Sequence, residues 1–504
     1  MDQLVSFPPA FSREETKVIR DPIHGYIKLT GLESELLKLP EINRLHWIKQ
    51  MGLGNYVYPC GIVTRFAHSL GVMQVASTMT MQIISQLNKE ELGNLFPGFR
   101  NDVSKLIQVV RLAGLLHDIG HGPFSHASEY IMTLCMKNFH KSELDEAYNL
   151  LGINKRNISI KIPIHEYYTY KLLTERSTIT EILDKNSIDP KWVGSLLMKG
   201  SSVPKEFSQT GIRLLRSIIS SQIDADRMDF LLRDSYFTGA HYGITDYNRI
   251  IMSLKLCKND DMYTLAIHER AIGAVEDMID ARYKMYKWVY HHHCKVGLEA
   301  LLEKAIATMC KNDKSLLKCF YWKELIENHI TDEWVLWQIH NFIRDNRDEG
   351  KYFYGLFNRN YLPVSLMKRP SDYEDFENRI LENMGVYDTA ELKRKLTKFL
   401  LTAEEFENSE EGEIYLLTVN MPHSPYRPLR KDYSVYIFSE SEGRPVELLD
   451  YSPYVEAVNE EWENYPSYYI GYVTGKERKR GDELKKEKEQ VLSKLAEEIA
   501  AIQI

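Results

Sequence analysis

Apolar residues at helical spacing predict a mainly α fold for residues 41–309. In residues 103–116 they recur at Val103, Ile107, Val110, Leu112 and Leu115. Residues 66–87 and 213–237 have the same period, so we expect two further long helices. Each of the three predicted helices carries histidine or aspartate side chains, at one end or along one face. The sequence therefore predicts three helices that converge on one polar site.

The composition is that of an ordinary globular protein. The chain has 504 residues, of which 44% are hydrophobic and 27% are charged. Because the N-terminus lacks a basic and apolar leader and no stretch reaches membrane-spanning length, we expect a cytoplasmic protein without a membrane partner. Six scattered cysteines without a CxxC pair indicate reduced thiols, so metal binding must come from histidine and aspartate. A net charge of -8 disfavours a general nucleic-acid coat, whereas a local pocket for phosphates stays open.

The character of the chain changes beyond about residue 349. Four strand-like segments, separated by proline and glycine, lie at residues 414–419, 434–438, 446–449 and 468–473. The Lys/Glu-rich tail predicts an exposed amphipathic helix. We therefore predict a helical core with a smaller α+β C-terminal region, in four parts: an N-terminal strand/turn segment that contributes to an interface (1–40), the helical domain (41–348), the α+β region (349–475) and the charged helix (476–504).

Histidine and aspartate residues on the three predicted helices form a candidate metal site. Imidazole and carboxylate suit Mn, Fe, Ni or Zn better than the all-oxygen shells of Mg or Ca, so His68, His117, Asp118 and one later aspartate make a plausible ligand set. On the third helix Asp226 and Asp229 share one face, and helical geometry alone leaves them tied as the fourth ligand. The alternative is a structural ion network with the neighbouring arginines, which the nearby His-Asp pair disfavours.

Three further histidines lie close in sequence to this site. His121, His126 and His165 can each supply a proton near neutral pH, and a phosphate ester departs well only if its leaving oxygen is protonated or bound to a metal. Any single one of them could be a core histidine with a satisfied hydrogen bond. Three together favour acid chemistry beside the metal.

An ordered set of motifs resembles the HD-domain deoxynucleoside triphosphate triphosphohydrolases. The motifs are RLHWIKQMG at 44–52, YVYP at 56–59, TRFAHSLGV at 64–72, LHDIGHGPFSH at 116–126 and DADRMDFLLRD at 224–234. The similarity covers roughly residues 17–304 and is far more specific than a lone His-Asp pair. It implies a helical HD-domain phosphohydrolase core.

The resemblance also implies roles for particular residues. It makes Asp226 the fourth metal ligand, with His68, His117 and Asp118, and places His121, His126 and His165, with Asp118, in the catalytic set at the α-phosphate. It implies substrate binding by Gln50, Arg65, Arg227, Asp234, Arg282 and Tyr290, with Gln50 and Asp234 at the 3′-hydroxyl and Tyr290 beneath the deoxyribose. Lys17, Val18 and Arg44 match a regulatory nucleotide pocket at a subunit interface.

The implied reaction is hydrolysis of a dNTP to deoxynucleoside and inorganic triphosphate, with Mg on the triphosphate beside the transition metal. The resemblance further implies a homotetramer or hexamer that an activating or inhibiting nucleotide regulates. Lys38 stands where the vertebrate branch has a guanine-reading aspartate, so activation by GTP is not expected. The biological setting is dNTP pool control or antiviral defence by dNTP depletion. The alternatives are an HD-family nuclease or cyclic-nucleotide phosphodiesterase, and a non-catalytic nucleotide sensor.

Overall fold

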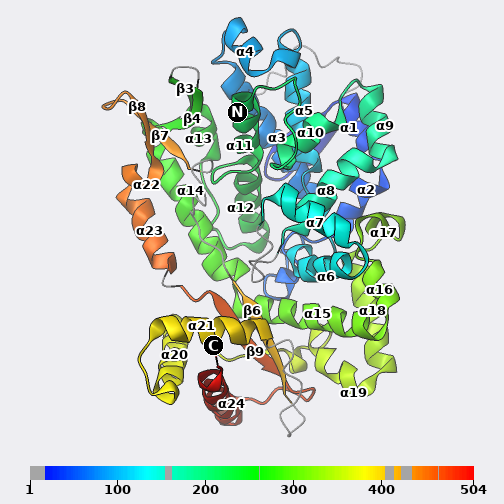
Figure 1. Ribbon diagram of the computed structural model, residues 1–504, viewed down its shortest axis with the longest axis vertical. Coiled ribbons are helices and arrows are strands. Elements are labelled where there is room, and N and C mark those ends of the chain that lie inside the picture. Colours follow the sequence, from blue (N-terminus) through cyan, green and yellow to red (C-terminus); the bar gives the residue numbers. More distant parts are fainter. Residues whose placement is uncertain are drawn as a thin grey trace. The chain divides into compact units, whose positions relative to one another are not determined.

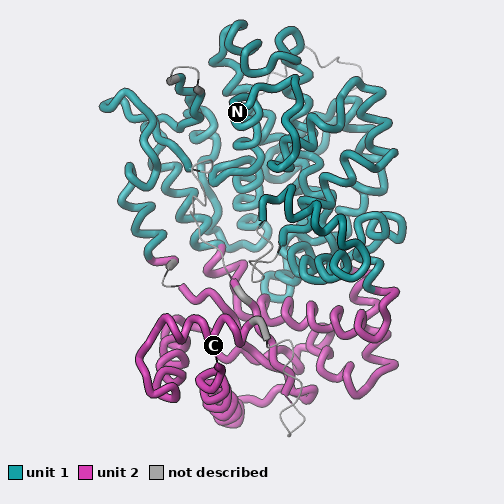
Figure 2. The backbone as a smooth tube through the Cα atoms, in the orientation of Figure 1, with its two compact units in different colours: residues 1–285, 317–332, 425–460 teal, residues 286–316, 333–424, 461–504 magenta. Residues whose placement is uncertain are grey.

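The computed structural model describes residues 17–153, 162–259, 262–402, 414–421, 434–463 and 465–503. The chain divides into two compact units (Figure 2), of which unit 1 contains the described residues among 1–285, 317–332 and 425–460. Unit 2 contains those among 286–316, 333–424 and 461–504. Helices predominate in both units (Figure 1), so the predicted mainly α fold with a smaller α+β C-terminal part is confirmed. The four predicted domain limits stay a prediction.

Unit 1 is a helical body with two small sheets. Its helices are α1 (Gly31–Leu36), α2 (Pro40–Asn43), α3 (Arg65–Ile84), α4 (Lys89–Leu95), α5 (Val103–Leu116), α6 (Glu129–Phe139), α7 (Lys141–Leu151), α8 (Ile164–Glu175), α9 (Ser177–Lys185), α10 (Pro190–Leu197), α11 (Gln209–Ile219), α12 (Ala225–Thr238), α13 (Tyr247–Met252), α14 (Ile272–Met285), α17 (Trp322–Glu327) and α22 (Leu448–Tyr451). An antiparallel hairpin joins β1 (Lys17–Asp21) and β2 (Gly25–Leu29). The second sheet has the order β3-β4-β7-β8, from Leu254–Asn259, Met262–His268, Tyr436–Ser439 and Arg444–Glu447, and only its β4–β7 pair is parallel.

Unit 2 is built on a hydrophobic core between a three-stranded antiparallel sheet and helices. The strand order is β5-β9-β6, from Val364–Ser365, Tyr468–Val473 and Tyr415–Asn420. The helices are α15 (His293–Asn312), α19 (Arg347–Gly350), α20 (Pro370–Met384), α21 (Thr389–Thr402) and α24 (Gly481–Ala501), while α16 (Lys314–Lys318), α18 (Asp332–Asp345) and α23 (Pro453–Glu463) run across the limits between the units. Buried side chains of α20, α21, β9 and α24 form the core. The predicted C-terminal amphipathic helix is α24, and its apolar face completes this hydrophobic core.

The predicted strands at 414–419, 434–438 and 468–473 are β6, β7 and β9. The strand expected at 446–449 ends with β8 at Glu447, because helix α22 begins at Leu448. These strands divide between two sheets, since β7 pairs with β4 and β6 pairs with β9. The single helix expected over residues 213–237 is wrong. The chain leaves the helical conformation between α11 and α12, where Asp224 accepts hydrogen bonds from the backbone N–H groups of Ser221 (2.6 Å) and Arg227 (2.7 Å). This carboxylate caps α12, and a capping residue has non-helical backbone angles.

Two glycines let three helices of unit 1 approach closely. A Cβ atom on Gly114 of α5 would lie 2.9 Å from the Cα atom of Met73 on α3. A Cβ atom on Gly71 of α3 would lie 1.8 Å from a carboxylate oxygen of Asp229 on α12. Both distances are shorter than real Cβ contacts, so only glycine fits. The packing of α3 against α5 and α12 brings the polar ends of these helices together.

Candidate metal centre

The capped ends of α3, α5 and α12 fix the four predicted metal ligands. The Thr64 hydroxyl caps α3, which places His68 in its first turn. His117 is the C-terminal cap of α5, and Asp118 follows it directly. Asp226 lies in the first turn of α12, two residues after its cap. Each ligand therefore stands at or next to the end of a helix.

The side chains of these four residues converge. Ligand atoms of His68, His117 and Asp118 lie within 4.8 Å of one another. The Asp226 Oδ1 atom lies 3.0 Å from His68 Nε2 and 3.9 Å from His117 Nε2. Two imidazoles and two carboxylates at these distances are compatible with a divalent metal ion.

Outer hydrogen bonds turn both imidazoles toward the centre. His117 Nδ1 donates to the Gly114 carbonyl oxygen at 2.8 Å, and its buried Nε2 has no hydrogen-bond partner in the described part of the chain. His68 Nδ1 lies 2.8 Å from Asp229 Oδ2, which leaves its Nε2 for the centre. The buried unpaired Nε2 of His117 fits a metal ion, and so does the Nε2 of His68, whose hydrogen bond goes to Asp226, another predicted ligand.

The electrostatics of the centre favour positive charge between the carboxylates. Burial opposes a charge on His68, but Asp226 and Asp229 raise its pKa to about 10. Burial also opposes ionisation of Asp118, yet Arg65, His117 and His121 hold the pKa of this carboxyl well below its usual value. Both carboxylates of the centre are thus anionic at neutral pH, because the pKa of Asp226 is also lowered, to about 2, against its burial and by His68.

The structure separates the two aspartates that the helical pattern left tied. Asp226 faces the Nε2 side of His68, and Asp229 faces its Nδ1 side. Asp224 is occupied as the cap of α12 and as an ion-pair partner of Arg227. Of these three carboxylates, Asp226 is the one that lies on the Nε2 side of His68 and close to His117, with its Oδ1 atom 3.9 Å from His117 Nε2.

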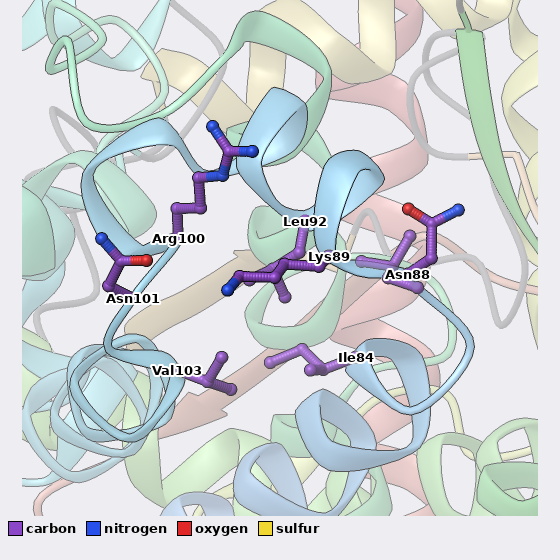
Figure 3. Close-up of a pocket in the computed structure, with 8 residues that line it drawn as sticks. Ile84, Asn88, Lys89, Leu92, Arg100, Asn101 and Val103 are labelled. Carbon is purple, nitrogen blue, oxygen red and sulfur yellow. The ribbon is translucent and has the colours of Figure 1, made fainter.

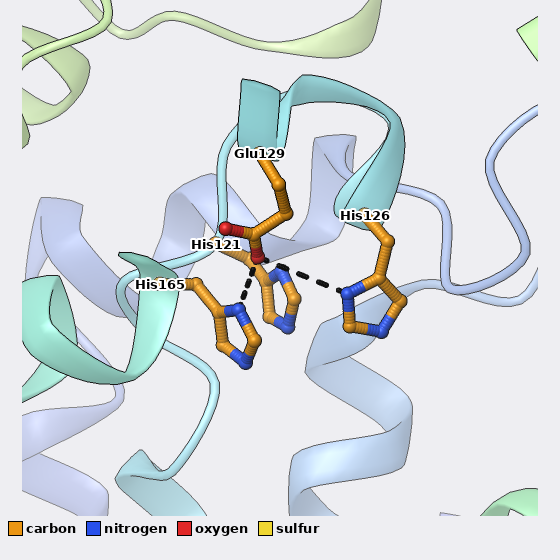
Figure 4. A group of neighbouring side chains, drawn as sticks. All are labelled: His121, His126, Glu129 and His165. Carbon is orange, nitrogen blue, oxygen red and sulfur yellow. Dashed lines mark hydrogen bonds and ion pairs between the residues drawn. The ribbon is translucent and has the colours of Figure 1, made fainter. Parts of the chain in front are cut away.

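The three predicted proton-donating histidines lie together beside the centre. The His121 and His165 rings stack at 3.8 Å, and the His126 ring lies 5.0 Å from His121 (Figure 4). His121 Nε2 lies 3.3 Å from Asp118 Oδ1, which joins this cluster to the metal ligands. His126 is 71% exposed, so it faces solvent.

Glu129 completes the histidine cluster, and the sequence reasoning missed it. Its Oε1 hydrogen-bonds to His165 Nδ1 and lies 3.8 Å from His126 Nδ1 (Figure 4). Burial opposes ionisation of Glu129, but His165 and His126 lower its pKa strongly. The i,i+3 spacing of His126 and Glu129 at the start of α6 is the sequence signal that could have found it.

A strained turn holds His126. Phe124 and Ser125 have φ angles of 56° and 58°, which non-glycine residues rarely adopt. The Phe124 N–H donates to Asp332 Oδ1 at 2.6 Å, and the Ser125 hydroxyl donates to the Lys49 carbonyl oxygen at 2.6 Å. These buried contacts hold the turn in a conformation that the local sequence would not choose.

The predicted substrate-binding residues are divided between the units. Arg65 is buried beside the centre, where it donates to Asp118 and to Ser125 Oγ. Arg227 pairs with Asp224, and Arg282 of α14 donates to Gln222 at 2.9 Å. The buried Oε1 atom of Gln50 has no hydrogen-bond partner among the described residues. Asp234 is buried on α12, and Tyr290 lies in unit 2 on a π-helical turn (Tyr286–Tyr290).

The three predicted regulatory residues have different surroundings. Lys17 and Val18 are exposed on β1. Arg44 is fully buried, and its guanidinium donates to the carbonyl oxygens of Ile119 (3.0 Å) and His121 (2.7 Å). Arg44 therefore supports the loop that carries His121, and a nucleotide-binding role for Lys17, Val18 and Arg44 stays a prediction.

A separate surface pocket of about 430 Å³ contains none of the predicted site residues (Figure 3). It lies in unit 1 and is lined by Ile84, Leu87, Asn88, Lys89, Leu92, Arg100, Asn101 and Val103.

Among the described residues, none of the helices is both long enough and apolar enough to cross a membrane.

Two parts of the chain match known protein families. Residues 65–184 match the HD domain and residues 245–323 match the HD associated region. An uncharacterized protein of Mycoplasma genitalium is 32% identical over 331 residues, which are 60% of this chain and 68% of that protein. The human deoxynucleoside triphosphate triphosphohydrolase SAMHD1 is 30% identical over 290 residues, which are 56% of this chain and 42% of SAMHD1.

Two solved structures share the fold. A hypothetical protein from Aquifex aeolicus has a TM-score of 0.62 at 21% identity, with 96% of this chain and 99% of that one covered. A phosphohydrolase from Bacteroides thetaiotaomicron has a TM-score of 0.59 at 23% identity, with 91% and 100% covered.

Together, the helical fold, the His/Asp cluster and the family matches define an HD-domain phosphohydrolase. The chain belongs to the HD-domain family that includes the deoxynucleoside triphosphate triphosphohydrolases. It spans between 42% and 68% of the length of the curated relatives it matches.

Proposed function

We propose that this protein hydrolyses deoxynucleoside triphosphates to deoxynucleoside and inorganic triphosphate. The observation that carries the proposal is the His68, His117, Asp118 and Asp226 centre joined to a histidine cluster through the 3.3 Å contact of Asp118 with His121. A metal of the Mn, Fe, Ni or Zn type, held by the four ligands, would supply Lewis-acid polarisation of the phosphoryl group and of the attacking water. The similarity to SAMHD1 supports dNTPs as the substrate class.

The chain's own residues supply the remaining chemistry. Arg65, buried beside Asp118, offsets negative charge that develops on the phosphoryl oxygens. We place His126 and His165 beside the leaving 5′-oxygen, with His165 as its proton donor, and Glu129 orients both rings. We assign the remaining phosphate contacts to Arg227 and Arg282, with Mg on the triphosphate.

Three residues carry the proposed sugar recognition. The unpaired Gln50 Oε1 atom is an acceptor for the 3′-hydroxyl, since a buried acceptor without a partner costs free energy until a ligand donates to it. We assign the second 3′-hydroxyl contact to Asp234. The ring of Tyr290 beneath C2′ would exclude an added 2′-hydroxyl.

The substrate proposal is tested with wild-type protein supplied with Mn²⁺ and Mg²⁺ and each of the four dNTPs, alone and in pairs. Inorganic triphosphate should be released whole, together with the deoxynucleoside. Release of phosphate or pyrophosphate would contradict the proposal. Cleavage of short single-stranded DNA or a cyclic nucleotide without dNTP hydrolysis would make the protein a phosphodiesterase instead.

Tyr290→Ala should narrow the difference in rate between dNTPs and rNTPs. A ring that denies the 2′-hydroxyl both space and a hydrogen-bond partner discriminates by about 1–3 kcal/mol, which is about 5- to 150-fold. The rates for dATP and ATP are compared in the wild type and in the variant. Equal wild-type rates on the two sugars would refute the selectivity.

We also propose that the active form is a homotetramer or hexamer regulated by a bound nucleotide. Exposed apolar side chains at the end of α12 and beyond it support an interface, because Tyr236, Tyr242 and Ile244 are 60%, 42% and 64% exposed. Mass measurement in solution with and without each dNTP, paired with activity, should show nucleotide-dependent assembly. A fully active monomer that ignores every nucleotide pair would refute it.

A further inference from the structure

A buried chain of polar contacts leads away from the metal centre on the outer side of His68. His68 Nδ1 donates to Asp229 Oδ2 at 2.8 Å. The other oxygen of Asp229 lies 2.6 Å from Nε2 of His24, which stands in the turn between β1 and β2. His24 and Asp229 are 205 positions apart in the sequence. The turn of the N-terminal hairpin is thus one carboxylate away from a predicted metal ligand.

Arg233 closes this network. Its Nε and one terminal nitrogen donate to the two oxygens of Asp229, both at 2.9 Å, and the other terminal nitrogen donates to Asp21 Oδ2 at 2.7 Å. The second oxygen of Asp21 accepts from the backbone N–H groups of Ile23 and His24, both at 2.9 Å. Asp21 therefore holds both the turn and the arginine.

The network has little freedom to rearrange. Asp229 and Arg233 are fully buried, and the His24 side chain is 3% exposed. The Tyr247 hydroxyl lies 3.3 Å from His24 Nδ1, so the ring has a partner on each nitrogen. Each carboxylate oxygen of Asp229 has two hydrogen-bond partners. A shift of the turn would therefore change the hydrogen bond between Asp229 and His68.

We propose that His24 and Asp229, joined through Arg233 to Asp21, are positioning residues that orient the His68 imidazole and set the metal affinity of the centre. The inference rests on the proposed function only in taking His68 as a metal ligand. By accepting from Nδ1, Asp229 keeps the Nε2 lone pair of His68 directed at the centre, and His24 fixes the carboxylate in place. Residues that support a metal ligand in this way change metal affinity by about 10- to 100-fold when they are lost.

A second buried network on the same hairpin provides a matched control. Arg111 of α5 donates to both oxygens of Glu33 at 2.6 and 2.7 Å and to the Lys28 carbonyl oxygen at 2.9 Å. Arg111 thus links the β1–β2 hairpin to α5 through a buried arginine–carboxylate pair, as Arg233 links it to α12. Glu33 also accepts from the Thr30 N–H group and from Gln108, and Arg111 also meets Met73 Sδ, and none of these partners is one of the four predicted ligands.

The experiment measures Mn²⁺ binding to the full-length protein by calorimetry in the absence of substrate, and unfolding of the metal-free protein in chelator. Asp229→Asn and His24→Ala should weaken Mn²⁺ binding by about 10- to 100-fold, and His24→Gln, which keeps a donor, should recover part of the affinity. Glu33→Gln should lower the unfolding temperature and leave Mn²⁺ affinity unchanged.

Unchanged Mn²⁺ affinity in folded His24→Ala would overturn the proposal, and so would an equal loss in Glu33→Gln. If Asp229→Asn does not fold, the comparison of His24→Ala with His24→Gln decides the result. Because binding is measured without nucleotide, a wild-type protein that binds Mn²⁺ but does not hydrolyse dNTPs would refute the proposed reaction and leave this inference intact.

Discussion

Asp226→Ala should abolish metal binding and lower hydrolysis by more than about a thousandfold, because the metal supplies several kcal/mol of transition-state stabilisation. The Asp226 carboxylate lies 3.0 Å from Nε2 of His68 and 3.9 Å from Nε2 of His117. Without it the centre keeps only three protein donors. Metal content of the purified protein and the rate of triphosphate release are measured together.

Asp224→Ala is the control for this prediction. It removes a carboxylate two residues away that caps α12 and pairs with Arg227. Loss of a helix cap costs about 0.5–2 kcal/mol of stability, so the variant should unfold at a lower temperature and retain its metal. Full metal occupancy in Asp226→Ala would show that another residue completes the centre.

His165→Ala should lower the turnover rate by about 10²- to 10⁴-fold, which is the usual contribution of a positioned general acid. Metal content should not change, because the His165 side chain contacts Glu129 and the two other histidines of its cluster, and its interaction with the ligand Asp118 is only electrostatic. The rate with saturating dNTP and the bound metal are measured in parallel. A rate within a few-fold of wild type would remove His165 from the mechanism.

Glu129→Gln tests the same mechanism through its pH dependence. Burial alone would lower the pKa of His165, but the Glu129 carboxylate, with Glu166 and Asp118, raises it above the usual value. The protonated acid is therefore kept to higher pH and is lost as pH rises through that pKa. Removing the charge of Glu129 should move the alkaline limb of the kcat/KM profile to lower pH. An unchanged alkaline limb would contradict the role of Glu129.

Helical periodicity predicted the local structure around the centre well. The segment expected at residues 103–116 is α5, and His68 falls in the first turn of α3, because both helices bury apolar faces at regular spacing. The break between α11 and α12 was missed. It depends on hydrogen bonds of one carboxylate to two backbone groups, and the apolar pattern carries no sign of them.

Interactions between distant segments could not be predicted from spacing. His24 meets Asp229, and Arg44 meets the carbonyl oxygens of Ile119 and His121, only after the chain has folded. The motif match predicts Arg44 at a nucleotide pocket. Such a match gives the position of a residue in the sequence, and it does not show that the side chain is buried. Asp226 and Asp229 could not be separated by helical geometry, since the choice depends on which nitrogen of His68 each one faces.

The strained turn at Phe124 and Ser125 has a consequence for the evolution of stability in this chain. Left-handed backbone at non-glycine residues costs about 1–3 kcal/mol each, and the turn is held by Asp332 and Lys49 from distant segments. Selection for heat resistance alone would favour replacements that relax this turn. Such replacements would also release His126, so thermostable variants that keep their activity should carry their stabilising substitutions outside residues 122–126.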